Sequence, residues 1–401
     1  MEFLMPGFAD ITAKLAKRSQ AQVARDKSTS AETPIRLELS ALPVRDETKH
    51  DRGRNVFFSR GQFLARQDRW DVLGRLIAET DRNRLTTPSG VSMASLLADG
   101  ARADAVSQAR TAIADGGQST PAGITALEEL IEDHAETWGV ALVVARAQIE
   151  CAWAWQGQVD PYALPHKPKP DFHDCFARAF ELIDYAGDRA PKSAEIAASR
   201  CDLLAADPMA EARVDLFHAR AMEADPENPG RLRAYGVHLL PRWFGTHTRL
   251  AATAEDMAVN DACDWGNRAY TWMWFDALRL DPGSAAVMEA DRFIAGMHEI
   301  LEINPAPHMA NLMAAYAAGM SAATAPDDLS AEARKVRARI HAALPELLDA
   351  YLTELHPQVW ARAHALPGSA HVGPLSHGRI AAAAAQARQA IDNAMSDRDE
   401  A

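Results

Sequence analysis

Residues 264–280 carry aromatic and basic side chains at a spacing that suits the binding of an anionic group or an acidic peptide. In a helix that turns by about 100° per residue, Trp272 projects roughly 160° away from Trp274, onto a second face of the segment. Three further residues share that face, namely Arg268, Phe275 and Arg279. Because Trp and Arg most often anchor interfaces and arginine pairs well with anions, we predict that this face binds a partner. The alternative is that the face is buried against the next layer of helices.

A turn at residues 239–247 holds two further candidates for binding, Arg242 and Trp243. Pro241 ends the preceding helix, because proline has no N–H to donate and its ring clashes with the preceding turn. Arg242 and Trp243 would then lie at one end of a stack of helices, where they can contact a partner or a ligand. The alternative is that Trp243 and Phe244 fill the space between helix ends.

The sequence contains none of the familiar catalytic or metal-binding motifs. The patterns Gly-x-Gly-x-x-Gly, Gly-x-x-x-x-Gly-Lys and Gly-x-Ser-x-Gly do not occur. The segment that begins at His298 is similar to the His-Glu-x-x-His motif of zinc proteases, but Glu302 replaces the second histidine. We therefore predict no catalytic residue, no metal site and no cofactor.

The composition is that of an acidic, globular chain. Its 401 residues include 42 Lys and Arg against 55 Asp and Glu, a formal net charge of −13. An acidic chain repels the phosphate backbone, so we predict no nucleic-acid binding. Residues 140–155 form the most apolar long stretch but contain Arg146, Gln148 and Glu150, which argues against a membrane span. The first residues lack a basic segment followed by a long apolar one, so we expect no signal peptide and a cytoplasmic protein.

Four cysteines fall in helical patterns, and no two of them are spaced as Cys-x-x-Cys. They are Cys151, Cys175, Cys201 and Cys263. We expect them to be small buried hydrophobic residues in a reducing compartment.

Helices must position these candidate residues, because apolar residues recur with helical spacing from about residue 56 onward and β-branched alternation is almost missing. We therefore predict an all-α fold. The run 137–157 is apolar on nearly its whole circumference, which is typical of a helix buried between neighbours on both sides. Three sites, Asp225-Pro226, Asp281-Pro282 and Asn304-Pro305, end one apolar-periodic run just before another begins. Proline stops a helix yet fits the first position of the next, so we predict a helix boundary at each site.

The segments that end at these prolines resemble the end of a tetratricopeptide repeat, a helix pair of about 34 residues. Residues 217–229, 276–282 and 298–305 carry the likeness, which covers roughly residues 172–322. The three prolines are 56 and 23 positions apart, so we expect a degenerate array and not a regular repeat. The resemblance implies a right-handed array of antiparallel helix pairs whose curved surface binds another protein.

The chain is predicted to have three parts. Residues 1–55 form a basic, partly disordered extension with a short helix at 9–25. Residues 56–366 form the helical array, and residues 367–401 form a linker and an Ala-rich C-terminal helix.

The function that these features favour is a non-enzymatic scaffold that binds a protein or peptide segment, acidic in character, on the surface of the helical array. An all-α enzyme or small-ligand-binding protein with an interhelical pocket stays open as an alternative, and histidines such as His173, His238 or His298 would serve it. A third alternative is a structural homo-oligomer in which Trp272 is buried at a self-interface. We expect no stable membrane insertion in any of these cases.

Overall fold

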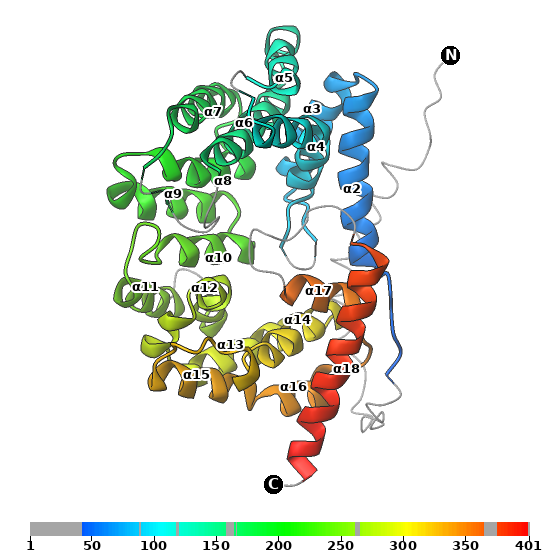
Figure 1. Ribbon diagram of the computed structural model, residues 1–401, viewed down its shortest axis with the longest axis vertical. Coiled ribbons are helices and arrows are strands. Elements are labelled where there is room, and N and C mark those ends of the chain that lie inside the picture. Colours follow the sequence, from blue (N-terminus) through cyan, green and yellow to red (C-terminus); the bar gives the residue numbers. More distant parts are fainter. Residues whose placement is uncertain are drawn as a thin grey trace. The chain divides into compact units, whose positions relative to one another are not determined.

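Helices make up every regular element that the structure describes (Figure 1). A computed structural model of the chain describes residues 42–87, 90–117, 120–157, 164–165, 167–260, 265–364 and 375–399. Within these residues there are seventeen α-helices and no strand, so the predicted all-α fold is confirmed for them. None of the described helices combines the length and the apolarity that crossing a membrane requires.

The α-helices are labelled α2 to α18 in chain order (Figure 1). Their bounds are α2 Lys49–Arg66, α3 Trp70–Arg82, α4 Met93–Ala114, α5 Ala122–Asp133, α6 Trp138–Gln156, α7 Pro170–Arg189, α8 Ala194–Asp202, α9 Ala210–Ala224, α10 Pro229–His238, α11 His247–Val259, α12 Asn267–Leu280, α13 Ala290–Ile303, α14 Pro307–Ala318, α15 Ala331–His341, α16 Leu344–Tyr351, α17 Pro357–His364 and α18 His377–Asp399. Short 3₁₀ helices lie between some of them: η3 Leu203–Ala206, η4 Pro282–Val287 and η5 Ala322–Thr324.

The chain divides into two units, residues 1–38 and residues 39–401, and all described residues belong to the second unit. The short helix predicted at residues 9–25 therefore lies outside the described residues, as does most of the linker predicted at residues 367–375.

Helix α2 begins at Lys49, within the segment that the sequence predicts as a loose extension. The cause is a capping box formed by Thr48 and Asp51. The Thr48 hydroxyl accepts from the Asp51 N–H at 3.1 Å, and the Asp51 carboxylate accepts from the Thr48 N–H at 3.0 Å. These bonds satisfy two backbone donors that a helix start otherwise leaves unpaired.

An α-helix ends at each of the three predicted Asp-Pro or Asn-Pro sites. At the second site a helical element begins at the proline, as expected, but it is the 3₁₀ helix η4, with Asp281 before it. At the other two sites the expectation that the proline opens the next helix is wrong, because a short connection comes first. After Pro226, the next α-helix starts at Pro229, with Asn228 as its capping residue. After Pro305, the next α-helix starts at Pro307. In both cases a second proline takes the first helical position, where its missing N–H costs nothing.

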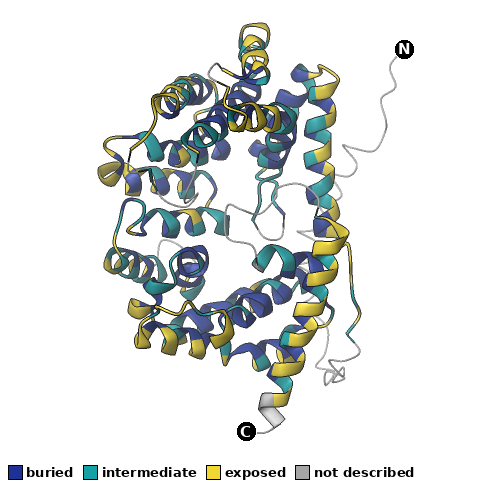
Figure 2. Cartoon of the chain, viewed as in Figure 1, coloured by how far each residue is buried: buried dark blue, intermediate teal, exposed yellow. Residues whose placement is uncertain are grey.

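Helix α6 is the most deeply buried element of the first half of the unit, as its apolar circumference predicts. It packs against α4 and α7, and both α6 and α12 are drawn almost entirely as buried in Figure 2. Glycines allow other helices to approach closely. A Cβ atom added at Gly100 of α4 would lie 1.9 Å from the Phe58 carbonyl oxygen of α2.

The buried apolar side chains form two clusters that divide at η3. The first cluster extends from Phe57 on α2 to Leu203, and the second extends from Leu204 to Ala394 on α18. The region around α8 to α10 is therefore the boundary between two packed halves.

The first described residues pair with the segment between α16 and α17. The Leu355 N–H donates to the Pro43 carbonyl oxygen at 2.8 Å, and the Arg45 N–H donates to the Leu355 carbonyl oxygen at 2.8 Å. Beside these bonds, the rings of His50 on α2 and His308 on α14 lie 3.8 Å apart between centroids. We refer to the pairing of Pro43 and Arg45 with Leu355 as the closing contact.

Candidate functional site

Two of the predicted binding residues, Trp272 and Phe275, lie in the core. Trp272 is 2% exposed and Phe275 is 1% exposed, and their ring centroids are 5.1 Å apart. Arg233 of α10 covers both rings, with its guanidinium carbon 5.9 Å from the Trp272 ring centroid and 5.0 Å from that of Phe275. Asp276 fixes this guanidinium group through two hydrogen bonds of 2.8 Å. The second face of α12 is therefore packed against α10, which is the alternative that the sequence left open.

The other four predicted residues are half-buried. They are Arg242, Trp243, Arg268 and Arg279. The Trp243 ring lies 6.2 Å from that of Trp153 and 5.0 Å from that of His238, so it occupies space between helices. Arg268 lies over the Trp265 ring at 5.2 Å. Because Trp272 and Phe275 are buried, the six residues do not share one exposed face, and their role in binding stays a prediction.

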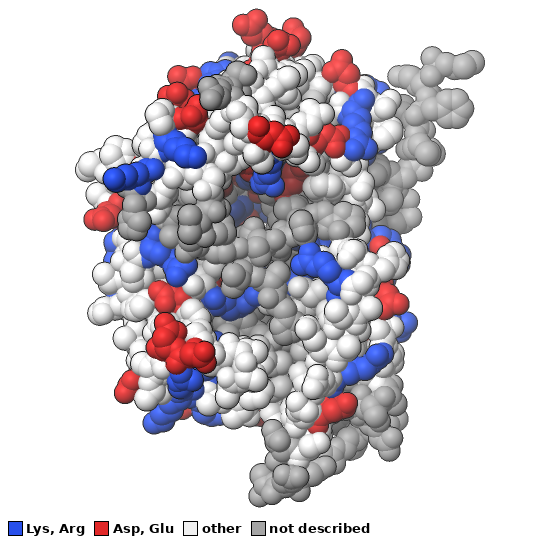
Figure 3. All heavy atoms as spheres, viewed as in Figure 1, with Lys and Arg blue, Asp and Glu red and all other residues white. Residues whose placement is uncertain are grey.

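A pocket of about 430 Å³ opens between α4, α6, α8, α9 and α10, and the sequence did not predict it. It lies where the two hydrophobic clusters meet. In Figure 3, basic and acidic side chains lie next to one another around a hollow beneath α4 and α6. The carboxylate, guanidinium and imidazole groups of the lining belong to Asp99, Arg102, Arg146, Glu150, Glu195, Asp202, His218 and Arg231. A concave site of this size between packed halves is typical of small-molecule binding.

Glu195, at the start of α8, is the centre of a buried ion-pair network in the wall of this pocket. One of its carboxylate oxygens accepts from Arg146 Nη2 at 2.6 Å, and the other accepts from Arg231 Nη2 at 3.4 Å. Burial raises the pKa of Glu195, but the charges of Arg146 and Arg231 and a hydrogen bond from Ser92 outweigh it and hold the pKa at about 2. Glu195 is therefore an anion near neutral pH, and it ties α6 and α10 to α8.

A second group of ion pairs lies on the wall formed by α4 and α6. Arg102 donates to Glu150 at 2.7 Å and lies 2.7 Å from Asp99, and Glu150 also accepts from Arg110 at 2.8 Å. Burial lowers the pKa of Arg102, but the charges of Asp99 and Glu150 reverse this effect and raise it. Arg102 is therefore a cation held by two carboxylates, although its buried Nη1 atom has no hydrogen-bond partner among the described residues.

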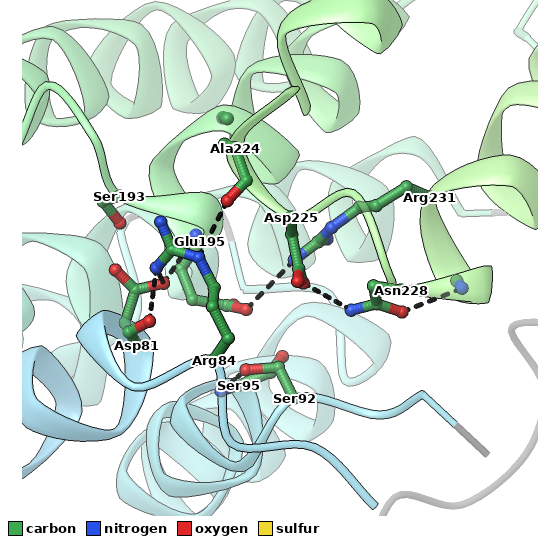
Figure 4. Close-up of polar contacts among 12 residues, drawn as sticks. Asp81, Arg84, Ser92, Ser95, Ser193, Glu195, Ala224, Asp225, Asn228 and Arg231 are labelled. Carbon is green, nitrogen blue, oxygen red and sulfur yellow. Dashed lines mark hydrogen bonds and ion pairs between the residues drawn. The ribbon is translucent and has the colours of Figure 1, made fainter. Parts of the chain in front are cut away.

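The connection between α9 and α10 brings Arg231 to the pocket, so the first Asp-Pro site helps to build it. Asn228 donates to Asp225 at 2.7 Å and accepts from the Gly230 N–H at 2.9 Å. Arg231 lies 3.5 Å from Asp225 and 3.4 Å from Glu195. Figure 4 shows Arg231 between these two carboxylates. The capped turn therefore fixes both the start of α10 and the direction of its arginine.

Arg84 joins three backbone segments behind Glu195 (Figure 4). Its side chain donates to the carbonyl oxygen of Ala224 at 2.8 Å and to that of Lys192 at 2.6 Å, and it lies 3.5 Å from the Asp81 carboxylate. Asp81 in turn accepts from the Glu195 N–H at 3.1 Å. These bonds hold the end of α9 and the start of α8 together, so contacts within the chain fix this wall of the pocket.

Asp202, the last residue of α8, differs from the other carboxylates of the pocket. No hydrogen bond or ion pair joins it to another residue in the described ranges, and its side chain is exposed to the space of the pocket. The surrounding protein still withdraws enough water to raise the pKa of Asp202 to about 6, against the opposing charges of Arg146, Arg231 and Arg102. A carboxyl group that titrates near neutral pH in a pocket suits proton transfer or charge-dependent binding.

Of the three histidines that the sequence offers for catalysis, His238 lies behind the pocket. Its Nδ1 is 3.0 Å from Nε2 of His218, a residue of the lining. Burial lowers the pKa of His238 to about 4, and burial together with His238 lowers that of His218, so both rings are neutral near pH 7. His173 is exposed, and Nδ1 of His298 lies 3.2 Å from the Tyr351 hydroxyl. Within the described residues, no three His, Cys, Asp or Glu side chains are arranged to hold a metal ion.

One signal in the sequence points to the pocket. Arg146, Gln148 and Glu150 interrupt a run that is otherwise apolar on all sides. A charge on a fully buried helix must be paired by a group from another element, because an unpaired buried charge is very unfavourable. The sequence does not identify that partner, since Glu195 lies 49 positions away.

No protein-family model, no curated protein and no solved structure matches the chain. The fold and the pocket are therefore the grounds on which a function can be proposed.

Proposed function

We propose that the chain binds a small polar molecule in the pocket between α4, α6, α8, α9 and α10. The observation that carries this proposal is Asp202, which lines the pocket without a partner among the described residues, whereas the arginines around it are paired. A volume of about 430 Å³ suits a ligand of metabolite size. A carboxylate left without a partner in such a space is available to a ligand.

The walls of the pocket are fixed in advance, which favours binding because little order has to be created when a ligand enters. Arg146 shows this most clearly. Besides its bond to Glu195, it donates to the Ser95 hydroxyl at 2.7 Å and to the Ser199 hydroxyl at 3.1 Å. Its guanidinium group therefore has one position, set by α4 and α8 together.

A panel of small polar compounds, observed by ligand-detected nuclear magnetic resonance, tests the proposal. The wild-type protein is compared with Ala198→Trp and Ala234→Trp, which place a large ring in the pocket from α8 and from α10. Compounds that bind the wild-type protein should lose binding to both variants. A bound ligand should also raise thermal stability, by about 2.7 kcal/mol at a concentration one hundred times its dissociation constant.

Two results would contradict the proposal. In the first, no compound of the panel binds the wild-type protein. In the second, the compounds that do bind are retained by both tryptophan variants, although circular dichroism shows the variants to be helical. Two variants on different helices are used so that misfolding of one does not decide the result.

The second candidate function is the peptide-binding scaffold that the sequence favoured. The tetratricopeptide-like, right-handed arrangement of helix pairs and the cytoplasmic location also stay predictions. Trp272, the main residue predicted to contact a partner, is only 2% exposed and is therefore not accessible to one. Arg242 and Trp243 are two of the four predicted residues that are half-buried, with Arg268 and Arg279. Loss of partner capture in an Arg242→Ala variant would support the scaffold.

A further inference from the structure

The charges that line the pocket are unequal in number. Four carboxylates, from Asp99, Glu150, Glu195 and Asp202, face three guanidinium groups, from Arg102, Arg146 and Arg231. The imidazole of His218, which α9 contributes, is neutral because burial lowers its pKa. The lining is therefore one negative charge in excess when Asp202 is ionised.

Most carboxylates and guanidinium groups of the lining already form ion pairs with one another, so few of them are available to a ligand. Glu195 accepts from Arg146 and Arg231, and Glu150 accepts from two other arginines. An anionic ligand would compete with these carboxylates for the guanidinium groups, because the two guanidinium nitrogens of the lining that have no hydrogen-bond partner among the described residues, Arg102 Nη1 and Arg231 Nε, are buried. Breaking a buried ion pair leaves a buried charge uncompensated, which is strongly unfavourable. A cationic ligand breaks no ion pair, because the Asp202 carboxylate has no partner to give up among the described residues.

We infer that the ligand of this pocket carries a cationic amino or guanidino group that forms an ion pair with Asp202. This inference rests on the proposed function. The rest of the ligand would fill the space between α6 and α10. The ligand class is thus an organic cation of small size.

Three probes of equal chain length and different charge test this inference: the diamine putrescine, the diol butanediol and the dicarboxylate succinate. Their binding to the full-length protein is measured by isothermal titration calorimetry. Putrescine should bind, and its affinity should fall about tenfold or more in Asp202→Asn, because a hydrogen bond to a charged group is lost. Butanediol and succinate should not bind.

Asp133→Asn is the matched control. Asp133 is also the last residue of a helix, α5, and is exposed outside the pocket. This variant should bind putrescine as the wild-type protein does. Circular dichroism and the melting temperature establish that both variants are folded.

A second measurement needs no variant. Asp202 faces Arg102 on α4, Arg146 on α6, Arg231 on α10 and, from its own helix, Glu195. These groups keep their charge between about pH 5 and 7, and putrescine does too. With the pKa of Asp202 at about 6, its ionised fraction falls about tenfold over this range, and putrescine affinity should fall with it.

Three results would overturn the inference: putrescine does not bind the wild-type protein at millimolar concentration, it binds Asp202→Asn equally well, or its affinity is the same at both pH values. If succinate or butanediol binds instead, and Ala198→Trp removes that binding, the pocket still binds ligands and only the ligand class is wrong. If no compound responds to Ala198→Trp, the proposed function fails as well.

Discussion

Arg146 and Glu195 form a buried ion pair, with 2.6 Å between Nη2 and Oε2, that joins the middle of α6 to the start of α8. Both side chains are almost fully enclosed, at 10% and 2% exposed. The pair therefore links the central helix of the first half of the unit to the pocket at its boundary. Substitutions in this pair and elsewhere in the core test how much each contact contributes to the free energy of unfolding.

Arg146→Met should lower the free energy of unfolding by about 3–5 kcal/mol, because it leaves a buried carboxylate with an incomplete set of partners. Urea unfolding measures the loss. The control is Arg75→Met, which breaks an exposed pair with Asp71 and should cost less than about 1 kcal/mol. A loss for Arg146→Met no larger than that of the control would show that the network does not stabilise the fold.

Acid should destabilise the protein, because His50 and His308 are buried as neutral rings. Burial lowers the pKa of His50 to about 2 and that of His308 to about 3, assisted by the neighbouring charges of Arg54 and Arg362. In the unfolded chain both histidines titrate near pH 6.5, so below this pH the unfolded state binds more protons than the folded state. The free energy of unfolding should fall as pH is lowered, by about 2 kcal/mol per histidine between pH 7.5 and 5.

The pH dependence is measured by urea unfolding at several pH values. The double variant His50→Gln, His308→Gln should reduce the dependence of the free energy of unfolding on pH, by the equivalent of up to two protons taken up on unfolding. His377→Gln, at an exposed position of α18, should leave this dependence unchanged. An equal slope in the wild-type protein and the double variant would mean that these two rings are not the groups that titrate on unfolding.

Gly100→Ala should destabilise the contact between α2 and α4. The added Cβ would lie 1.9 Å from the Phe58 carbonyl oxygen, so the helices must move apart at a cost of at least about 2 kcal/mol. Gly53→Ala in α2 is the matched control, since a Cβ there meets no atom within 4 Å. It should stabilise the protein by about 0.5–1 kcal/mol through helix propensity. Equal effects of the two substitutions on the melting temperature would contradict this packing.

Trp272→Ala should behave as a core substitution. Because Trp272 is 2% exposed and packed against Phe275, we expect a loss of about 3–5 kcal/mol in the free energy of unfolding. Chemical denaturation gives the value. A variant that keeps wild-type stability yet loses capture of a partner would instead support the binding role that the sequence suggested.

Single helices could be predicted from the sequence because their signals are local. The run 137–157 has its apolar residues on all sides, and α6 is both helical and buried. Proline and capping residues likewise mark the ends of α9 and α13, since the chemistry of a helix end lies within a few residues. The helical periodicity therefore predicts that these segments are helices, and the proline sites predict where α9 and α13 end.

The contacts between helices could not be predicted in the same way. A helical wheel shows that Trp272 lies on a second face, but it does not show that Arg233 of α10 covers that face. The pocket could not be predicted for the same reason, because it depends on contacts between helices that are distant in the sequence. Arg231 and Glu195, for example, lie 36 positions apart. Helical periodicity gives the direction of each side chain within its own helix only, and the partner helix is set by packing of the whole unit.

The closing contact has a consequence for how the chain reaches its fold during synthesis. Arg45 forms an ion pair with Glu354, which lies 309 positions later in the sequence. At about 5–20 residues per second, a ribosome needs roughly 15–60 s to add the residues between them. During that time Pro43 and Arg45 cannot form the closing contact, because Leu355 has not been added. The first half of the unit must therefore hold together through its own hydrophobic cluster.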